Sequence, residues 1–245
     1  MEKFKVETKF NHLESNFQPI RVCIHNKNNY ENSTFVGNDE YINTFQDVDY
    51  SGSNDYYKLN KMLNGGWETY VISDMNSKNK FTKGLYDCTG FIIVGEDKDT
   101  NQNISILSHQ DPKEFLNPAL INSFSSHLIE SLRKILARSK KGSIDAIIYG
   151  GNKFDNFGQN RDNYEKSIKL VSEIINSELG FKPNVTTGPK EDVGSSDIYF
   201  DNKNRRAYLF MPEQKKDITL HDFHPDKVKE QVTKQNNQKP NKDYI

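Results

Sequence analysis

The sequence contains very little cysteine. Its 245 residues include two, Cys23 and Cys88, too few for the framework of several disulfides that holds small secreted domains together. Long apolar runs are also missing, because no run approaches the roughly 18 residues that a membrane-spanning helix needs. The N-terminal residues lack the apolar stretch of a cleavable export signal. We therefore expect a protein of a reducing compartment with no membrane span.

An excess of positive charge is absent as well. The chain carries 33 Lys and Arg against 34 Asp and Glu, for a formal net charge of -1 at pH 7. Proteins that bind nucleic acid through its phosphates usually carry a basic excess, so we expect no nucleic-acid partner. Hydrophobic residues make up only 34% of the sequence. This composition predicts a compact core surrounded by polar loops and tails.

Short apolar runs separated by turn residues predict strands along much of the chain. The predicted strands lie at residues 20–25, 70–73, 91–94, 104–107 and 144–149. Two further apolar runs, 198–200 and 207–210, flank the polar residues 201–204. This arrangement is typical of a hairpin.

Two segments have the spacing of amphipathic helices. The first has two possible starts, Asp111-Pro112 and Asn117-Pro118, since each pair places a capping residue before a proline. We expect the later start, because Pro118 inside a helix would cost a hydrogen bond. The predicted inward residues of this helix are Leu120, Phe124, Leu128, Leu132, Ile135 and Leu136. The second helix is predicted from about Asn163 to Leu179, where Gly180 ends it, with Ile168, Val171, Ile174, Ile175 and Leu179 inward.

These elements predict an α+β (mixed α/β) fold with a β-sandwich-like core flanked by helices. Residues 1–34 form a polar N-terminal segment that contains a first strand at 20–25. Residues 35–224 are predicted to form a single domain. Residues 225–245 are almost all polar, so we expect them to be a disordered tail.

A cysteine and a histidine stand near the ends of two predicted strands. The polar stretch 95–102 is expected to join these strands as a hairpin. If the strands pair symmetrically about it, Ile93 lies opposite Ile104 and Cys88 lies opposite His109. Opposed residues have Cβ atoms about 4.5–5.5 Å apart, so the histidine could take the thiol proton and leave a thiolate nucleophile. A slip of one residue would place the two on opposite faces.

Thr82 precedes Cys88 by six residues. If the segment between them is extended, an even separation keeps both on one face, and the Thr82 hydroxyl could accept the second N–H of the imidazole and hold its tautomer. Cys88, His109 and Thr82 are therefore the candidate catalytic residues. Each also has an ordinary structural interpretation, since a strand cysteine is often a small buried apolar residue and threonine is common in strands.

Cys23 and His25, two residues apart, do not make a metal site by themselves, because a zinc site needs three or four ligands. Gly150-Gly151-Asn152-Lys153 follows a predicted strand but lacks the Gly-Lys-Ser/Thr ending of a phosphate-binding loop. We therefore expect neither a metal nor a nucleotide cofactor.

Three motifs around the candidate residues are shared with a known enzyme family. The leucine and cysteine of a Leu-Ser-Gly-Cys motif are kept in Leu85-Tyr86-Asp87-Cys88. A histidine stands shortly before a proline in His109-Gln110-Asp111-Pro112. A threonine, Thr82, lies six residues before the cysteine. In these motifs the chain resembles the chemoreceptor glutamine deamidase family and the bacterial toxins of the cytotoxic necrotising factor type, which share its catalytic fold.

The resemblance continues downstream and covers about residues 75–211. The family's strand ending in Gly-Gly is similar to Ile148-Tyr149-Gly150-Gly151, and its Ile-Gly-x-x-Asn element is similar to Phe157-Gly158-Gln159-Asn160. Its Val-Gly-Gly turn before a hairpin is similar to Val193-Gly194-Ser195, followed by Ser196-Asp197-Ile198-Tyr199-Phe200. Here serine replaces the second glycine of that turn, an arginine expected before the hairpin is missing, and the Asn element is one residue short.

The resemblance implies a hydrolase that converts a glutamine side chain of a protein substrate to glutamate, using Cys88 and His109 through a thioester and no cofactor. It also implies a monomer that acts in the bacterial cytoplasm, or as a toxin-like effector secreted into a host cell without a cleavable signal. Three alternatives remain open. These are transglutamination, which shares the acyl-enzyme step; another thiol amidohydrolase or protease; and an inactive deamidase-like module that binds proteins.

Overall fold

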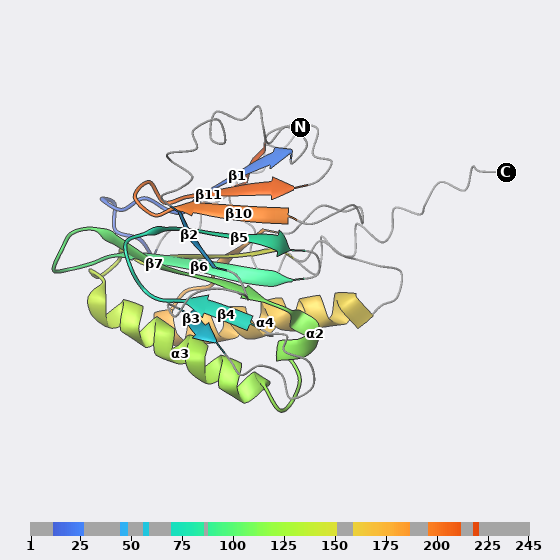
Figure 1. The fold of residues 1–245 in the computed structure, drawn as a ribbon. Coiled ribbons are helices and arrows are strands. Elements are labelled where there is room, and N and C mark those ends of the chain that lie inside the picture. The colour runs from blue at the N-terminus through green and yellow to red at the C-terminus, as the bar shows by residue number, and fades with distance from the viewer. Residues whose placement is uncertain are drawn as a thin grey trace, which may run out of the picture.

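Two β-sheets pack face to face, and helices cover the outer face of one of them (Figure 1). The structure is a computed structural model that describes residues 12–26, 45–48, 56–58, 70–85, 88–150, 159–186, 196–211 and 218–220. Its fold is of the α+β class with a β-sandwich core, so the predicted class is confirmed. The long helices lie on one side only, and the layers therefore follow the order sheet, sheet, helices.

The sheet farther from the helices is called sheet A. In spatial order its strands are β12 (Ile218–Leu220), β1 (Arg21–Asn26), β11 (Arg206–Met211), β10 (Ser196–Asp201), β5 (Asn79–Leu85) and β2 (Phe45–Asp47). The predicted hairpin is confirmed as β10 and β11, which pair antiparallel across the turn at 202–205. The predicted first strand is β1, which runs parallel to β11. An early segment of the chain thus pairs with strands from its C-terminal half.

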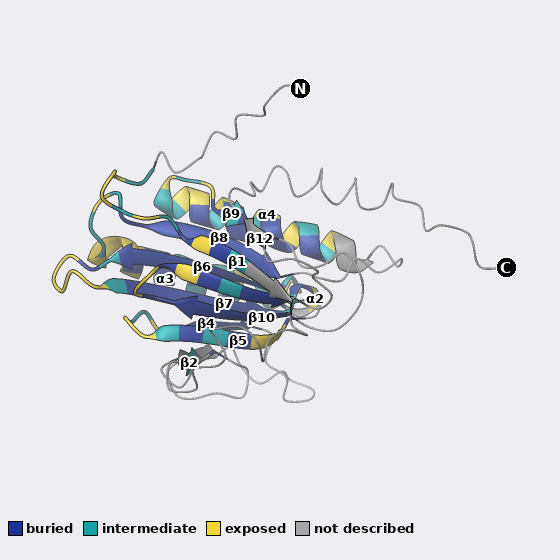
Figure 2. Cartoon of the chain, turned by 90° about the horizontal axis from the view of Figure 1, so that it is seen from above, coloured by how far each residue is buried: buried dark blue, intermediate teal, exposed yellow. Residues whose placement is uncertain are grey.

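Sheet B lies between sheet A and the helices. Its strands, in spatial order, are β3 (Tyr56–Lys58), β4 (Tyr70–Ser73), β7 (Asn103–Gln110), β6 (Thr89–Glu96), β8 (Asp145–Gly150) and β9 (Asn184–Val185). The central strands β6, β7 and β8 are buried along almost their whole length (Figure 2). Burial on both faces explains why their sequences are nearly continuous apolar runs.

Alternate residues of sheet B contribute to two separate cores. The core between the sheets contains Ile92, Val94, Leu107 and Ile147 of sheet B with Ile198, Phe200, Ala207 and Leu209 of sheet A. The core under the helices contains Phe91, Ile93, Ile106 and Ile148 of sheet B with Phe124, Leu128, Val171 and Ile175 of the helices. Sheet B is therefore the shared middle layer, and its alternation decides which side chains meet sheet A.

Of the two predicted helix starts, the earlier one begins a short helix, and the later one lies in the turn before the long helix. A single turn, α2 (Pro112–Phe115), begins where the Asp111 side chain accepts a hydrogen bond from the Lys113 amide at 2.9 Å. The side chain of Asn117 accepts a hydrogen bond from the Ala119 amide at 3.0 Å just before the long helix α3 (Ile121–Arg138). The N-cap of α3 is Leu120, which makes no side-chain capping hydrogen bond, so the predicted start at Asn117-Pro118 is wrong by three residues.

The buried residues of α3 include Phe124, Leu128, Leu132 and Ile135, as predicted. Leu136 is 48% exposed, so its predicted inward position is wrong. It follows Ile135 directly and lies about 100° further around the helix, beyond the packed stripe.

The helix α4 (Gln159–Leu179) begins earlier than predicted and ends where predicted, at Gly180. Gly180 has φ 80°, a left-handed conformation that glycine adopts without strain. Ile168, Val171 and Ile175 are buried, whereas Ile174 and Leu179 are only half-buried against the same core. Exposed residues alternate with buried ones along the helix, so one face packs and the other meets solvent (Figure 2).

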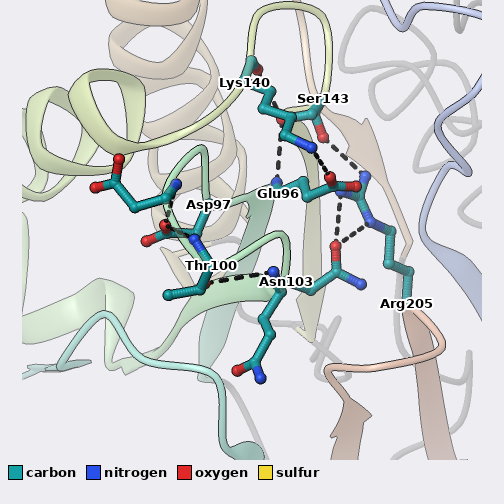
Figure 3. A network of polar contacts seen from close by, with 9 residues as sticks. Glu96, Asp97, Thr100, Asn103, Lys140, Ser143 and Arg205 are labelled. Carbon is teal, nitrogen blue, oxygen red and sulfur yellow. Dashed lines mark hydrogen bonds and ion pairs between the residues drawn. The ribbon is translucent and has the colours of Figure 1, made fainter.

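A polar clasp closes one end of the sandwich (Figure 3). Arg205, in the β10–β11 turn, is buried and donates hydrogen bonds to the Asn103 side chain at 3.0 and 2.9 Å. It also donates to the backbone carbonyls of Ser143 at 2.8 Å and of Gln18 at 3.0 Å. We use the name polar clasp for these four residues, which join both sheets, the segment before β8 and the segment before β1.

In the described part of the chain, every helix is too short or too polar to span a membrane. The predicted tail at 225–245 and the first 11 residues of the predicted N-terminal segment lie outside the described residues. The proposed domain limits stay predictions.

A lysine lies in the layer between the sheets. Lys80, on β5, is fully buried, and its ammonium group donates to the Asn76 side chain at 2.8 Å and to the Ser105 hydroxyl of β7 at 3.2 Å. It also reaches the backbone carbonyls of Asn76 at 3.4 Å and Lys78 at 3.2 Å. Burial lowers the pKa of Lys80 to about 7; the charge of Lys78 lowers it further and the charge of Asp74 opposes the change.

We expect Lys80 to make the stability of the protein depend on pH. The folded-state pKa of about 7 lies below the ordinary value of 10.5, so between these values the unfolded chain binds the extra proton. The free energy of unfolding should therefore rise with pH across this window, by up to about 1.4 kcal/mol per pH unit, and this gain should be absent below about pH 7. Urea unfolding at a series of pH values measures it.

The matched variant is Lys80→Met, which keeps an unbranched side chain of similar length and removes the group that titrates. It should lose this rise in stability between neutral and alkaline pH. Equal pH slopes for the wild type and the variant would contradict the role assigned to Lys80.

Candidate active site

The β6–β7 hairpin carries Cys88 just before its first strand and His109 near the end of its second. Its register differs from the predicted one by two residues, because Ile93 pairs with Ile106 and not with Ile104. The predicted direct pairing of Cys88 with His109 is therefore wrong.

Asp97 explains the different register. Its carboxylate accepts hydrogen bonds from the backbone N–H groups of Asp99 at 2.9 Å and Thr100 at 3.0 Å, and it pairs with Arg138 of α3 (Figure 3 shows the Asp97–Thr100 part). The bonds from Thr100 and Asp99 hold the pKa of Asp97 below its usual value. This compact turn starts at Asp97, so β6 continues through Glu96, and residues expected in the loop belong to the strand.

Cys88 and His109 nevertheless belong to the same face of sheet B. A shift of two residues preserves the alternation of side chains, whereas a shift of one would reverse it. Continuing the observed register places Gly90 opposite His109 and Cys88 diagonally beyond it, and diagonal neighbours lie about 7–8 Å apart. Cys88 is half-buried and packs against the core between the sheets, to which Leu107 also belongs.

His109 is held by a threonine from the other sheet. The Thr82 hydroxyl and the Nδ1 atom of His109 are 2.8 Å apart, and both side chains are buried. When the hydroxyl accepts a hydrogen bond from the Nδ1–H group, Nε2 is the basic nitrogen of the neutral ring. Nε2 is itself enclosed by the protein. The predicted hydrogen bond between Thr82 and His109 is thus confirmed.

The predicted route to this bond is wrong, because Thr82 and Cys88 do not share one extended strand. Thr82 pairs with Ile198 in sheet A, whereas Cys88 leads into sheet B. Gly84, with φ 75°, and a register shift between Ser196 and Ile198 accompany the end of β5. Thr82 therefore reaches His109 across the layer between the sheets and not along a strand.

Gly150 ends β8 beside the backbone of Cys88. Its φ of 90° lies in the left-handed region that favours glycine. A Cβ atom at this position would overlap the carbonyl oxygen of Cys88 and lie 3.1 Å from the Cα of Thr89. The first glycine of the Gly-Gly pair thus allows the close approach of β8 to the candidate nucleophile.

The remaining motif positions fall partly outside the described residues. Those outside are Tyr86, Asp87, Gly151, Phe157, Gly158, Val193, Gly194 and Ser195. Gln159 and Asn160 form the beginning of α4, and the segment after the Val-Gly turn is β10, directly beside the strand that carries Thr82.

Cys23 lies on the outer face of sheet A, because its neighbour Val22 belongs to the core between the sheets. Among the described residues, no group of three or more His, Cys, Asp or Glu is arranged to hold a metal ion. Sequence reasoning did not single out Gly90, Ser108 or Tyr149. The Tyr149 hydroxyl donates to the carbonyl of Ser108, the residue directly before His109, and a Cβ at Gly90 would overlap the Tyr149 ring. A glycine within an apolar strand, two residues after the cysteine, is the sequence signal that could have indicated Gly90.

No model of a known protein family matches the chain, and no curated protein is detectably similar to it. The candidate site therefore stands on its own geometry and on the motifs described above.

We predict that Gly150→Ala destabilises the protein more than Gly180→Ala does. Both glycines have positive φ, so each alanine costs about 1–2 kcal/mol of backbone strain. A Cβ at Gly180 meets nothing within 4 Å, whereas one at Gly150 overlaps the backbone of Cys88, which adds about 1–3 kcal/mol. Urea unfolding of the two variants compares the losses, and equal losses would contradict the close approach.

Proposed function

We propose that the chain is a cysteine-dependent protein-glutamine deamidase. Cys88 is the nucleophile, His109 is the general base and acid, and Thr82 orients His109. The observation that carries the proposal is the 2.8 Å contact between Thr82 and His109, on the face of sheet B to which Cys88 also belongs. A histidine fixed through one ring nitrogen, with a thiol near the other, is the general arrangement of thiol nucleophiles activated by a base.

The reaction proceeds in two halves. His109 takes the thiol proton, and the Cys88 sulfur attacks the amide carbon of a glutamine side chain. The C–N bond then breaks, and the imidazolium gives its proton to the leaving group, which departs as ammonia. In the second half His109 takes a proton from water, the resulting hydroxide attacks the thioester, and the C–S bond breaks. The imidazolium returns its proton to the Cys88 sulfur, the new carboxylic acid loses its proton to solvent as glutamate, and no cofactor is required.

The resemblance supports the choice of glutamine, and the exposure of Cys88 is compatible with it. Cys88 is only half-buried, whereas His109 is 1% exposed. A long side chain on a protein partner can reach such a nucleophile without the partner's backbone entering the sandwich. The proposed enzyme acts as a monomer on a protein substrate, in the bacterial cytoplasm or inside a host cell.

A second candidate is an inactive relative that kept the fold in order to bind proteins. The specific observation in its favour is the altered motifs, because only the leucine and cysteine of Leu-Ser-Gly-Cys remain and Ser195 replaces a glycine. Transglutamination and the hydrolysis of other amides share the thioester and differ only in the groups that enter and leave. Activity measurements distinguish all of these.

We expect substitutions of the three residues to affect deamidation in a fixed order. Cys88→Ser should abolish activity, because a serine hydroxyl is a much weaker nucleophile. His109→Ala should be almost as damaging, and Thr82→Val should slow the reaction about 5- to 30-fold, as the loss of one orienting hydrogen bond would. The assay measures ammonia release from glutamine-containing proteins, together with the mass gain of about 1 Da on the target.

Cys23→Ser is the matched control, since Cys23 lies on the outer face of the other sheet, and it should keep full activity. A Cys88→Ser protein that remains fully active would rule out the mechanism. Incorporation of a primary amine with little conversion of the glutamine amide to the acid would indicate transglutamination instead.

A further inference from the structure

The ladder between β6 and β7 is interrupted beside His109. Thr89 pairs with Gln110, and regular pairing resumes only at Ile92 and Leu107. Between these points a regular antiparallel ladder would pair Gly90 with His109 and Phe91 with Ser108, and neither pair is present in this described stretch. On their other edges, β6 pairs regularly with β8 and β7 pairs regularly with β4. The interruption is therefore confined to the seam between the two strands that lead to Cys88 and His109.

Two side-chain hydroxyls occupy the place of the missing backbone bonds. The Phe91 amide donates to the Ser108 hydroxyl at 2.8 Å and not to the Ser108 carbonyl. That hydroxyl in turn donates to the Gln110 side chain at 2.8 Å. The Ser108 carbonyl accepts its hydrogen bond from the hydroxyl of Tyr149, on β8. Ser108 is the residue directly before His109, so both hydroxyls act on the peptide that carries the histidine.

The Tyr149 side chain reaches β7 by crossing over Gly90. Tyr149 pairs with Gly90 across the β6–β8 ladder, and a Cβ at Gly90 would overlap both the Tyr149 ring and the Ser108 carbonyl. Tyr149 belongs to the core between the sheets, the same core against which Cys88 packs. Its hydroxyl therefore lies on the face that holds the candidate site, whereas the Ser108 hydroxyl closes the seam from the helix side. Burial raises the pKa of Tyr149 well above its ordinary value, so the hydroxyl stays a neutral donor.

We propose that Tyr149 is a positioning residue for His109. Its hydroxyl binds the Ser108 carbonyl where a regular ladder would have the Phe91 amide, which binds the Ser108 hydroxyl instead, and this holds the seam open where the histidine must face both Thr82 and Cys88. Gly90 is the residue that makes this possible, because any larger side chain would occupy the path of the tyrosine. The proposal rests on the proposed function, in which His109 activates Cys88.

The test measures alkylation of Cys88 by iodoacetamide between about pH 5 and 9, a range that brackets the ordinary histidine and thiol pKa values. Mass spectrometry separates the peptides of Cys88 and Cys23, so Cys23 is an internal reference in every sample. Tyr149→Phe keeps the ring over Gly90 and removes only the hydroxyl. Tyr70→Phe is the matched control, because it removes another buried tyrosine hydroxyl from sheet B, one that contacts His127 at 2.9 Å on the helix side.

In the wild type, Cys88 should react well below the ordinary thiol pKa of about 8.5, and His109→Ala should abolish this early reactivity. Tyr149→Phe should lower the rate for Cys88 at about pH 6.5 roughly tenfold and move its profile toward that of His109→Ala, as the loss of an orienting hydrogen bond would. Tyr70→Phe should leave the profile unchanged. A purely structural role of Tyr149 would lower the unfolding midpoint without moving the profile of the folded protein.

The outcomes separate the two proposals. If His109→Ala changes the Cys88 profile and Tyr149→Phe does not, the positioning role is wrong and the proposed function stands. If His109→Ala leaves the wild-type profile unchanged, the proposed function fails and the positioning role fails with it. Should Tyr149→Phe not fold, Gly90→Ala is the second variant, because its Cβ would overlap the Tyr149 ring and hydroxyl and so displace them from the Ser108 carbonyl. A Gly90→Ala profile identical to that of the wild type would then overturn the inference.

Discussion

The hydrogen bond between Thr82 and His109 is the constraint on which the candidate site depends. It joins the inner faces of two sheets within a largely apolar layer, where a polar group deprived of its partner costs about 1–3 kcal/mol. Lys80 and Ser105 form a second polar contact across the same layer. Both contacts link β5 to β7, so one sheet can slide over the other only by breaking both. The apolar core supplies the adhesion between the sheets, and these contacts select one alignment.

The two ends of the β6–β7 hairpin differ in what they do. At the loop end, Asp97 and the polar clasp around Arg205 hold the turn, both sheets and the start of β1 in place. At the other end the ladder opens, and Gly150 lets β8 approach the backbone of Cys88. The irregular pairing between β6 and β7 costs backbone hydrogen bonds. It is tolerated because polar contacts fix the loop end of the hairpin and because the hydroxyl groups of Ser108 and Tyr149 make hydrogen bonds in place of the missing ones.

Local patterns predicted most of the elements because strands and helices follow from the periodicity of nearby residues. The strands of the hairpin β10–β11, the end of α4 at Gly180 and the buried stripe of α3 are examples. The register of β6 and β7 was missed by two residues, since the turn is set by backbone N–H groups that bind Asp97 and not by the polarity of Gly95 and Glu96. Leu136 was placed inward because a list of apolar residues does not show where the packed face ends.

The sequence by itself determined the fold class, seven of the described strands, the two long helices and the three candidate residues, because these depend on residue type and short-range spacing. It did not predict β2, β3, β5, β9 or β12, which are short or carry few apolar residues. Only the tertiary structure decided that Thr82 meets His109 from the opposite sheet, that Tyr149 crosses Gly90, and that Lys80 is buried deeply enough to lower its pKa to about 7. Each of these depends on contacts between residues from 25 to 59 positions apart in the numbering, such as Lys80 with Ser105 and Gly90 with Tyr149. No local periodicity encodes such contacts, since they arise when one sheet packs on the other and when neighbouring strands choose a register.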